Sequence, residues 1–115
     1  MDPLYDQRGR VYAWLETATG RFIGLGGQQL AFLAGDNVYN WSGAHLGWWE
    51  HGHMRDRRGA VVVFLANATN LIVGKPGLSG RPGIPGISGV PGRPGLSGVP
   101  GRPGNAGGWT KQMPF

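Results

Sequence analysis

Cysteine is missing from this sequence of 115 residues. Its absence excludes disulfide bonds, thiolate metal sites and thiol nucleophiles. The sequence also lacks a run of about 20 apolar residues, which a membrane-spanning helix would need. The opening MDPLYDQRGR has an early acidic residue and no apolar stretch of the kind found in a secretory signal. We therefore expect no membrane partner and a cytoplasmic location by default, whereas an extracellular fibre would need a non-classical export route.

Acidic residues are scarce, and they are confined to the first part of the chain. All six Asp and Glu residues lie within residues 1–73. Six arginines in the same stretch balance their charge. From residue 74 onward there are five Lys or Arg residues and no acid, so this stretch carries the whole net charge of +5. A basic, acid-free segment favours polyanionic partners such as an anionic glycan or nucleic acid.

Four segments of the first 73 residues repeat one pattern. They are YDQRGRVYAWL (5–15), IGLGGQQLAFL (23–33), YNWSGAHLGWW (39–49) and RDRRGAVVVFL (55–65). In each, a glycine is followed five residues later by an aromatic residue. The glycines are Gly9, Gly27, Gly43 and Gly59, and the aromatic residues are Trp14, Phe32, Trp48 and Phe64.

Each repeat predicts a β-hairpin. In three of the four, an Asp or Asn precedes the glycine by three positions, which is typical of a tight turn that ends in a positive-φ residue. The β-branched and aromatic residues that follow favour a strand, with alternate side chains on opposite faces. Four such hairpins predict an all-β head of about eight antiparallel strands in pseudo-fourfold arrangement. We expect the four repeat aromatics to converge on a shared core.

The chain resembles the bacterial proteins known as 4-fold beta flower proteins. The resemblance rests on DPLYDQRGRVYAWL, on YNWSGAHLGWWEHGHMRDRRGAVVVFL and on the extended period-three tail. It implies a fourfold β head, and it carries over no catalytic residue because the family name describes a shape. There are two departures: the tail has glycine where the family implies a proline-rich sequence, and the second repeat lacks Asp or Asn at its turn.

The tail, residues 74–107, places a glycine at every third position. This period is the signature of the collagen triple helix, in which only glycine fits at the crowded axis. Proline fills seven of the eleven Y positions and favours a polyproline II backbone, which would form a rod of roughly 100 Å. The glycines expected to pack in an assembly are Gly74, Gly77, Gly80, Gly83, Gly86, Gly89, Gly92, Gly95, Gly98, Gly101 and Gly104.

The X positions of the tail differ from those of ordinary collagen because they hold aliphatic residues and no proline. The aliphatic residues are Leu78, Ile84, Ile87, Val90, Leu96 and Val99. Serine recurs every nine residues, at Ser79, Ser88 and Ser97, so a similar surface repeats along the tail. This pattern predicts packing onto neighbouring tails or heads, with Trp109 and Phe115 as further contacts. A flexible spacer is the alternative interpretation of a segment rich in glycine and proline.

Histidines provide the only candidate metal site. His45, His51 and His53 are close in the sequence and flank Glu50, and imidazole with carboxylate can bind zinc or copper. We favour a polar turn, because a convincing fourth ligand is missing. No nucleophile–base pair, carboxylate pair or phosphate-binding motif is present. We therefore predict no catalytic residue, no cofactor and no enzymatic activity.

The sequence thus predicts three parts: a four-repeat β head (1–73), a Gly-X-Y polyproline II tail (74–107) and an apolar C-terminal cap (108–115). The predicted function is that of a structural protein that forms a filament or fibre with copies of itself through the tail, with heads as nodes or displayed units. The alternative is a module that binds an anionic glycan or nucleic acid and is made multivalent by its basic tail.

Overall fold

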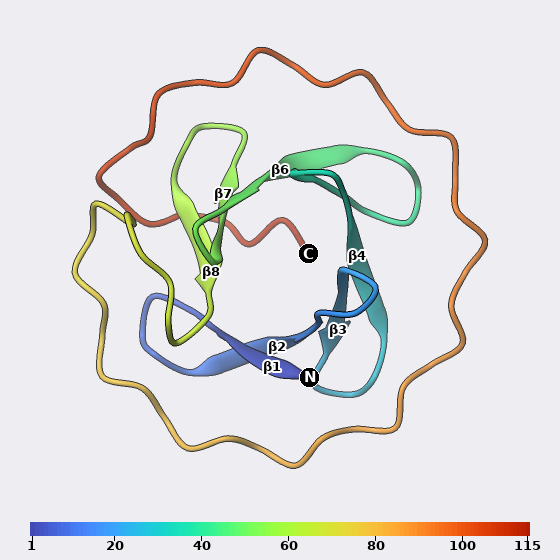
Figure 1. Cartoon of the computed structure of the whole chain (residues 1–115), viewed down its shortest axis with the longest axis horizontal. Coiled ribbons are helices and arrows are strands. Elements are labelled where there is room, and N and C mark those ends of the chain that lie inside the picture. The colour runs from blue at the N-terminus through green and yellow to red at the C-terminus, as the bar shows by residue number, and fades with distance from the viewer.

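The head is a closed barrel in the computed structural model, which describes all residues from 1 to 115. Its strands are β1 (Asp2–Tyr5), β2 (Val11–Glu16), β3 (Arg21–Gly24), β4 (Gln29–Ala34), β5 (Asn37–Tyr39), β6 (His45–Glu50), β7 (His53–Asp56) and β8 (Val61–Phe64). Each strand pairs antiparallel with the next, and β8 returns to β1 through the Tyr5–Phe64 pair (Figure 1). The predicted all-β head of four hairpins is confirmed. The chain contains no helix, and hence none with the length and apolarity needed to cross a membrane.

The four repeat glycines end tight turns at one end of the barrel, which we call the glycine-turn end. Consecutive turns of a meander alternate between the two ends, so these four turns share an end and the turns between repeats lie at the other. In the first turn, the Asp6 carboxylate accepts hydrogen bonds from the backbone N–H groups of Arg8 and Arg10. The second turn lacks this acid, and the Gln28 side chain accepts from Gly26 N–H instead, at 3.0 Å. A glutamine after the glycine therefore replaces the missing Asp or Asn.

A β-bulge lies beside each glycine turn, where the pairing register shifts once per hairpin. The unpaired residues are Tyr12, Leu30, Leu46 and Val62, each three positions after its glycine. A bulge sets two residues of one strand against one residue of its partner. In three hairpins the bulge residue and the next residue consequently both pack on the barrel interior, and in the third hairpin the next residue is Gly47. The simple alternation that we expected along these strands is interrupted there.

The barrel interior is filled by apolar side chains. The buried cluster consists of Leu4, Ala13, Leu15, Phe22, Ala31, Val38, Met54, Val62 and Val63. The repeat aromatics directly follow the inward positions, so they point out of the barrel wall. Our expectation that Trp14, Phe32, Trp48 and Phe64 converge on one central core is therefore wrong. All four are nonetheless buried, between 0% and 6% exposed, so other parts of the chain must cover the outside of the barrel.

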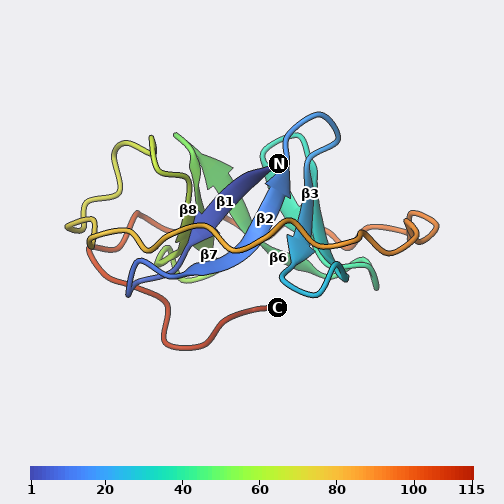
Figure 2. The same ribbon diagram turned by 90° about the horizontal axis from the view of Figure 1, so that it is seen from below.

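Residues 74–107 encircle the barrel wall as a belt (Figure 1). Seen from the side, the belt runs at mid-height between the two ends of the barrel (Figure 2). The whole molecule is a disc of 37 × 37 × 23 Å. The expected straight rod of roughly 100 Å is therefore wrong for the single chain, because the extended backbone bends around its own head.

The C-terminal segment, residues 108–115, leaves the belt and crosses the glycine-turn end of the barrel. It begins beside β8, where Val61 bridges Trp109 in parallel and Thr110 N–H donates to Val61 C=O at 2.8 Å. It ends near the barrel axis (Figure 1), where Phe115 packs on Phe22 and accepts a 2.5 Å hydrogen bond from the Tyr12 hydroxyl through its carbonyl oxygen. The segment thus closes this end of its own barrel.

Candidate functional site

The belt is attached to the head in a register of nine residues per quarter turn. Backbone N–H groups at belt positions 79, 88, 97 and 106 donate to the carbonyl oxygens of the four turn glycines, at 2.8–3.0 Å. The pairs are Ser79 with Gly9, Ser88 with Gly27, Ser97 with Gly43 and Ala106 with Gly59. The nine-residue period of the tail is therefore the step that carries it from one hairpin to the next.

The turn glycines also explain why the belt lies so close to the barrel. They have φ values between +76° and +91°, which disfavour any residue with a side chain. A Cβ atom at any of them would overlap the carbonyl oxygen of a belt glycine. At Gly27, for example, it would overlap the carbonyl oxygen of Gly86. The four repeat glycines thus serve both the turn and the contact with the belt.

Belt arginines cover two of the outward-facing aromatic rings. The Arg93 guanidinium lies 4.6 Å from the centre of the Phe32 ring and donates to Leu33 C=O at 3.2 Å. The Arg102 guanidinium lies 5.7 Å from the Trp48 ring and pairs with Glu50. These two positions are nine residues apart, so they are equivalent in the belt repeat. Two of the cations that we considered for polyanion binding are therefore engaged by the head.

Arg55 joins the two ends of the belt. Its side chain is fully buried, and its guanidinium donates to Gly59 and Ala106 carbonyls at 2.6 and 3.0 Å. It also donates to the carbonyls of Asn70 and Leu71, at 3.4 and 2.6 Å. Residues 70 and 71 precede the belt and residue 106 ends it, so one side chain fixes both. Arg55 is consequently unavailable to a polyanion.

The outer rim of the belt is apolar over most of its length. The six aliphatic X residues are each between 42% and 65% exposed. They are Leu78, Ile84, Ile87, Val90, Leu96 and Val99. The glycines from Gly74 to Gly104 have open space where a Cβ atom would stand, so no close-packed glycine face forms within one chain. Trp109 and Phe115, which we expected among the assembly contacts, instead pack on the chain's own Phe64 and Phe22.

The three histidines occupy different environments. His53 is completely buried, and burial lowers its pKa from 6.5 to about 4. His45 packs edge-on against Tyr39 and Trp48, and burial lowers its pKa as well. His51 is exposed in the turn between β6 and β7. No group of three His, Asp or Glu side chains is placed to hold a metal ion.

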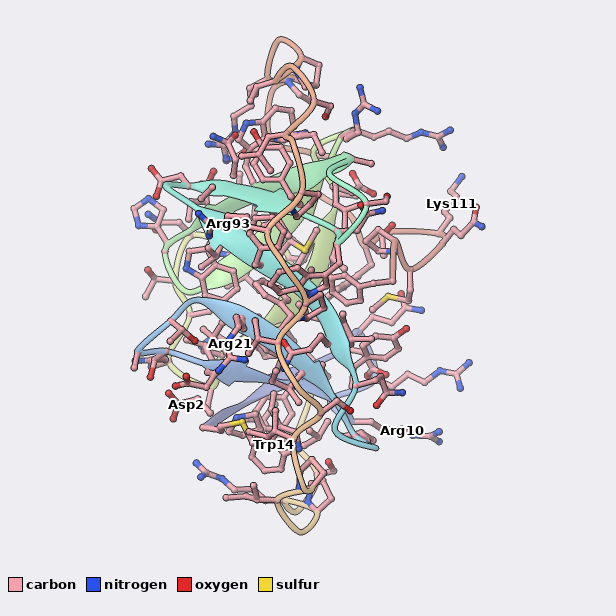
Figure 3. All side chains as sticks on the ribbon, turned by 90° about the vertical axis from the view of Figure 1, so that its right-hand side faces the viewer. Asp2, Arg10, Trp14, Arg21, Arg93 and Lys111 are labelled. Carbon is pink, nitrogen blue, oxygen red and sulfur yellow. The ribbon has the colours of Figure 1, made fainter.

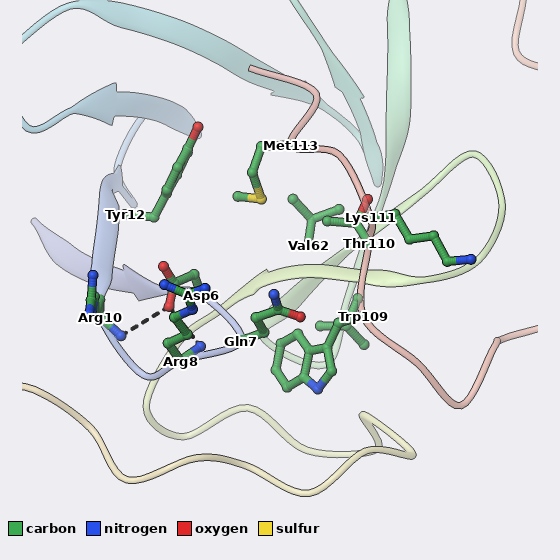
Figure 4. A pocket seen from close by; sticks show the side chains of 11 residues that line it. Asp6, Gln7, Arg8, Arg10, Tyr12, Val62, Trp109, Thr110, Lys111 and Met113 are labelled. Carbon is green, nitrogen blue, oxygen red and sulfur yellow. Dashed lines mark hydrogen bonds between the residues drawn. The ribbon is translucent and has the colours of Figure 1, made fainter.

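The glycine-turn end is hollowed and basic. A pocket of about 220 Å³ lies between the first turn and the C-terminal segment (Figure 4), and a wider, open hollow of about 920 Å³ lies on the other side of that segment. The cations around them are Arg8, Arg10, Arg57, Arg58 and Lys111, all exposed. None of the five is in an ion pair, because the two ion pairs of the molecule involve Arg21 and Arg102. Figure 3 shows Arg10 and Lys111 on one side of the belt and Asp2 and Arg21 on the other.

Sequence reasoning missed this basic end because its residues come from distant segments. Arg8 and Arg10 belong to the first turn, Arg57 and Arg58 to the last, and Lys111 to the C-terminal segment. In the sequence, acids next to these arginines made the head look neutral. The fold, however, gathers five exposed cations against only two side-chain carboxylates, Asp6 and Asp56, at this end. The equivalence of the two turns in the fourfold repeat was the signal that would have grouped them.

The family comparison agrees with the fourfold arrangement. The sequence description of the 4-fold beta flower protein family matches residues 2–113. The chain therefore belongs to this family. No curated protein and no solved structure matches the chain.

Proposed function

For this 4-fold beta flower protein, we propose a structural role, in which copies assemble into a filament or fibre through the outer rim of the belt. The observation that carries the proposal is the exposure of six aliphatic side chains on the rim. Large apolar side chains that gather on an exposed surface are typical of an interaction site. The heads are the nodes of the assembly, and their two ends remain free to be displayed.

The spacing of the rim residues gives each disc two sites of contact. Ile87 and Val90 occupy the same positions of the nine-residue unit as Leu96 and Val99. The two pairs therefore form similar apolar patches about a quarter turn apart on the disc. One disc can contact neighbours on two sides. Contact between like patches propagates as a filament, whereas contact between unlike patches a quarter turn apart would close as a ring.

The belt glycines support close contact between copies. The space beside each of them is open, so the backbone of another belt can approach without meeting a side chain. A glycine at every third position is not required by the packing of a single chain. Contact between belts gives this strict period a physical reason.

Catalysis is not part of the proposal. The only side-chain hydrogen bond of a histidine ring joins His45 to Asn37, so no histidine is placed as a base beside a hydroxyl group. Both ring nitrogens of His53 are buried without a partner. The His53 ring is therefore packed into the wall of the barrel and does not face a site.

Sedimentation velocity over a range of protein concentrations tests the proposal. The variant I87S/V90S/L96S/V99S removes both rim patches while keeping every glycine and proline of the belt. The matched control is L25S/I72S, which removes two exposed apolar side chains that are not among the rim residues. We expect the natural chain and the control to form large species, visible as filaments by electron microscopy, and the rim variant to remain a 12.3 kDa monomer. A natural chain that stays monomeric, or a rim variant that assembles equally well, would contradict the proposal.

A further inference from the structure

The free positive charge of the molecule is concentrated at the glycine-turn end. Five exposed cations surround this end, and its two carboxylates, Asp6 and Asp56, accept hydrogen bonds from their own turns. The other Asp56 oxygen accepts from the Thr110 hydroxyl at 2.8 Å. At the opposite end, Glu16 is paired with Arg21 and Glu50 with Arg102. The five exposed cations outnumber these two side-chain carboxylates, so this end keeps an excess of positive charge that attracts a polyanion.

The cations are arranged along a path that a chain molecule can follow. Arg8 and Arg10 line the smaller pocket, Arg57 and Arg58 line the wider hollow, and Lys111 lines both. Because the C-terminal segment separates the two hollows, the cations extend on both sides of it. A single small anion would use only part of this set, whereas a polymer with regularly spaced charges can use all of it.

The smaller pocket combines these charges with an aromatic and apolar lining. Tyr12, Trp109 and Met113 line it, together with Val61 and Val62 (Figure 4). Its volume of about 220 Å³ is below the roughly 300–1,000 Å³ of sites that enclose a whole small molecule. It accommodates one flat ring at a time. Trp109 is half-buried, with one side packed on Phe64, so its remaining surface is available at the pocket.

From this arrangement we infer that the glycine-turn end binds single-stranded nucleic acid. The phosphates contact the five cations, and one base enters the smaller pocket against Trp109. A basic path combined with an aromatic platform is the recognition mode of proteins that bind single strands with little sequence preference. An anionic glycan would satisfy the charges but offers no aromatic ring for the pocket. This site is separate from the rim of the belt, so it stands independently of the proposed assembly.

Fluorescence anisotropy with a labelled oligo-dT of about 12 nucleotides measures this binding. An abasic oligonucleotide of the same length and charge is the key comparison. We expect the abasic strand to bind about 5- to 100-fold more weakly, because a stacked base is lost. The logarithm of the binding constant should fall linearly with the logarithm of the salt concentration, with a slope of about −0.7 for each phosphate contacted. The variant R10Q/R57Q/K111Q should reduce that slope by roughly 2.

Two further variants keep the test decisive. The control K75Q/R81Q removes two exposed cations of the belt and should leave the affinity within about 3-fold of the natural chain. W109F preserves a ring against Phe64 and should weaken binding of oligo-dT while leaving binding of the abasic strand unchanged. The inference is overturned if oligo-dT does not bind, if the abasic strand binds equally well, or if the two charge variants lose the same affinity. Stronger binding of a heparin fragment than of oligo-dT would also overturn it.

Discussion

Glycine has two different roles in this chain, and they are distinguished by the space around each residue. The turn glycines have positive φ values and touch the belt backbone, so a methyl group has no room. The belt glycines have open surroundings, so a methyl group is accommodated in the single chain. The same residue type is therefore indispensable to the fold in the head and, by our proposal, important for assembly in the tail.

Replacing Gly27 and Gly89 by alanine separates these roles. We expect Gly27→Ala to lower the free energy of unfolding by about 1–3 kcal/mol, because the positive φ is strained and the new Cβ meets Gly86. Gly89→Ala should change the free energy of unfolding by less than about 0.5 kcal/mol but should weaken assembly. Denaturant unfolding followed by tryptophan fluorescence gives the first quantity and sedimentation velocity the second. Equal losses of stability in the two variants would contradict this division.

His53 makes the stability of the molecule depend on pH. Burial lowers its pKa to about 4 in the folded chain, against 6.5 for the ordinary value. Between these two values the unfolded chain binds a proton that the folded chain does not, so stability falls as the pH falls from about 6.5 to 4. The loss from this residue is at most about 3 kcal/mol. The lowered pKa of His45 acts in the same direction.

An NMR titration of the histidine side chains checks this directly. We expect the His53 signals to remain those of a neutral ring down to about pH 4. A His53 ring that titrates together with an unfolded-chain reference would show that it is not buried.

At the residue scale, the sequence predicted the repeat positions but not the direction of their side chains. The repeat aromatics were identified correctly as buried positions. Their outward direction could not be inferred, because a large aromatic ring normally indicates the interior of a small barrel. The cover over Phe32 comes from Arg93, a residue 61 positions away. Arg55 was missed as a structural residue for the same reason, since its partners lie in the loop before the belt and at the belt's end.

At the scale of elements, the hairpins were predictable from local pattern and the belt was not. The turn residues and the strands after them are determined by neighbours in the sequence. The path of the tail depends on a match of lengths. At about 3.1 Å per residue, 34 residues of polyproline II span roughly 105 Å. A circle with the 37 Å width of the disc has a circumference of about 115 Å. The 37 Å width includes the belt, so the comparison shows that the belt makes nearly one full turn, which becomes visible only once the width of the whole molecule is known.

Deleting one triplet from the belt tests this match. Removal of residues 89–91 shortens the tail by about 9 Å, so it can no longer reach all four glycine turns. We expect the free energy of unfolding to fall by about 2 kcal/mol or more, through lost hydrogen bonds and uncovered aromatic rings. The control Val90→Ser keeps the length and should be close to the natural chain. A flexible spacer would tolerate the deletion, because shortening a loop slightly costs almost nothing, and an unchanged stability would therefore contradict the belt.

At the scale of the whole molecule, the belt divides the surface into three regions with different chemistry. The rim presents aliphatic side chains, the glycine-turn end presents unpaired cations, and at the opposite end two glutamates are paired with arginines. The rim is the region to which we assign assembly, and the glycine-turn end is the one to which we assign nucleic-acid binding. Both assignments require that the tail is held against the head, because a detached tail would have no outer rim and would release the C-terminal segment.

Amide hydrogen exchange of the tail, resolved by NMR, is the most direct test of that requirement. Four tail amides donate to the turn glycines, those of Ser79, Ser88, Ser97 and Ala106. We predict slow exchange at these four positions, nine residues apart, and fast exchange at the glycines between them. Uniformly fast exchange from residue 74 to residue 107 would show that the tail is detached from the head, and it would contradict the belt.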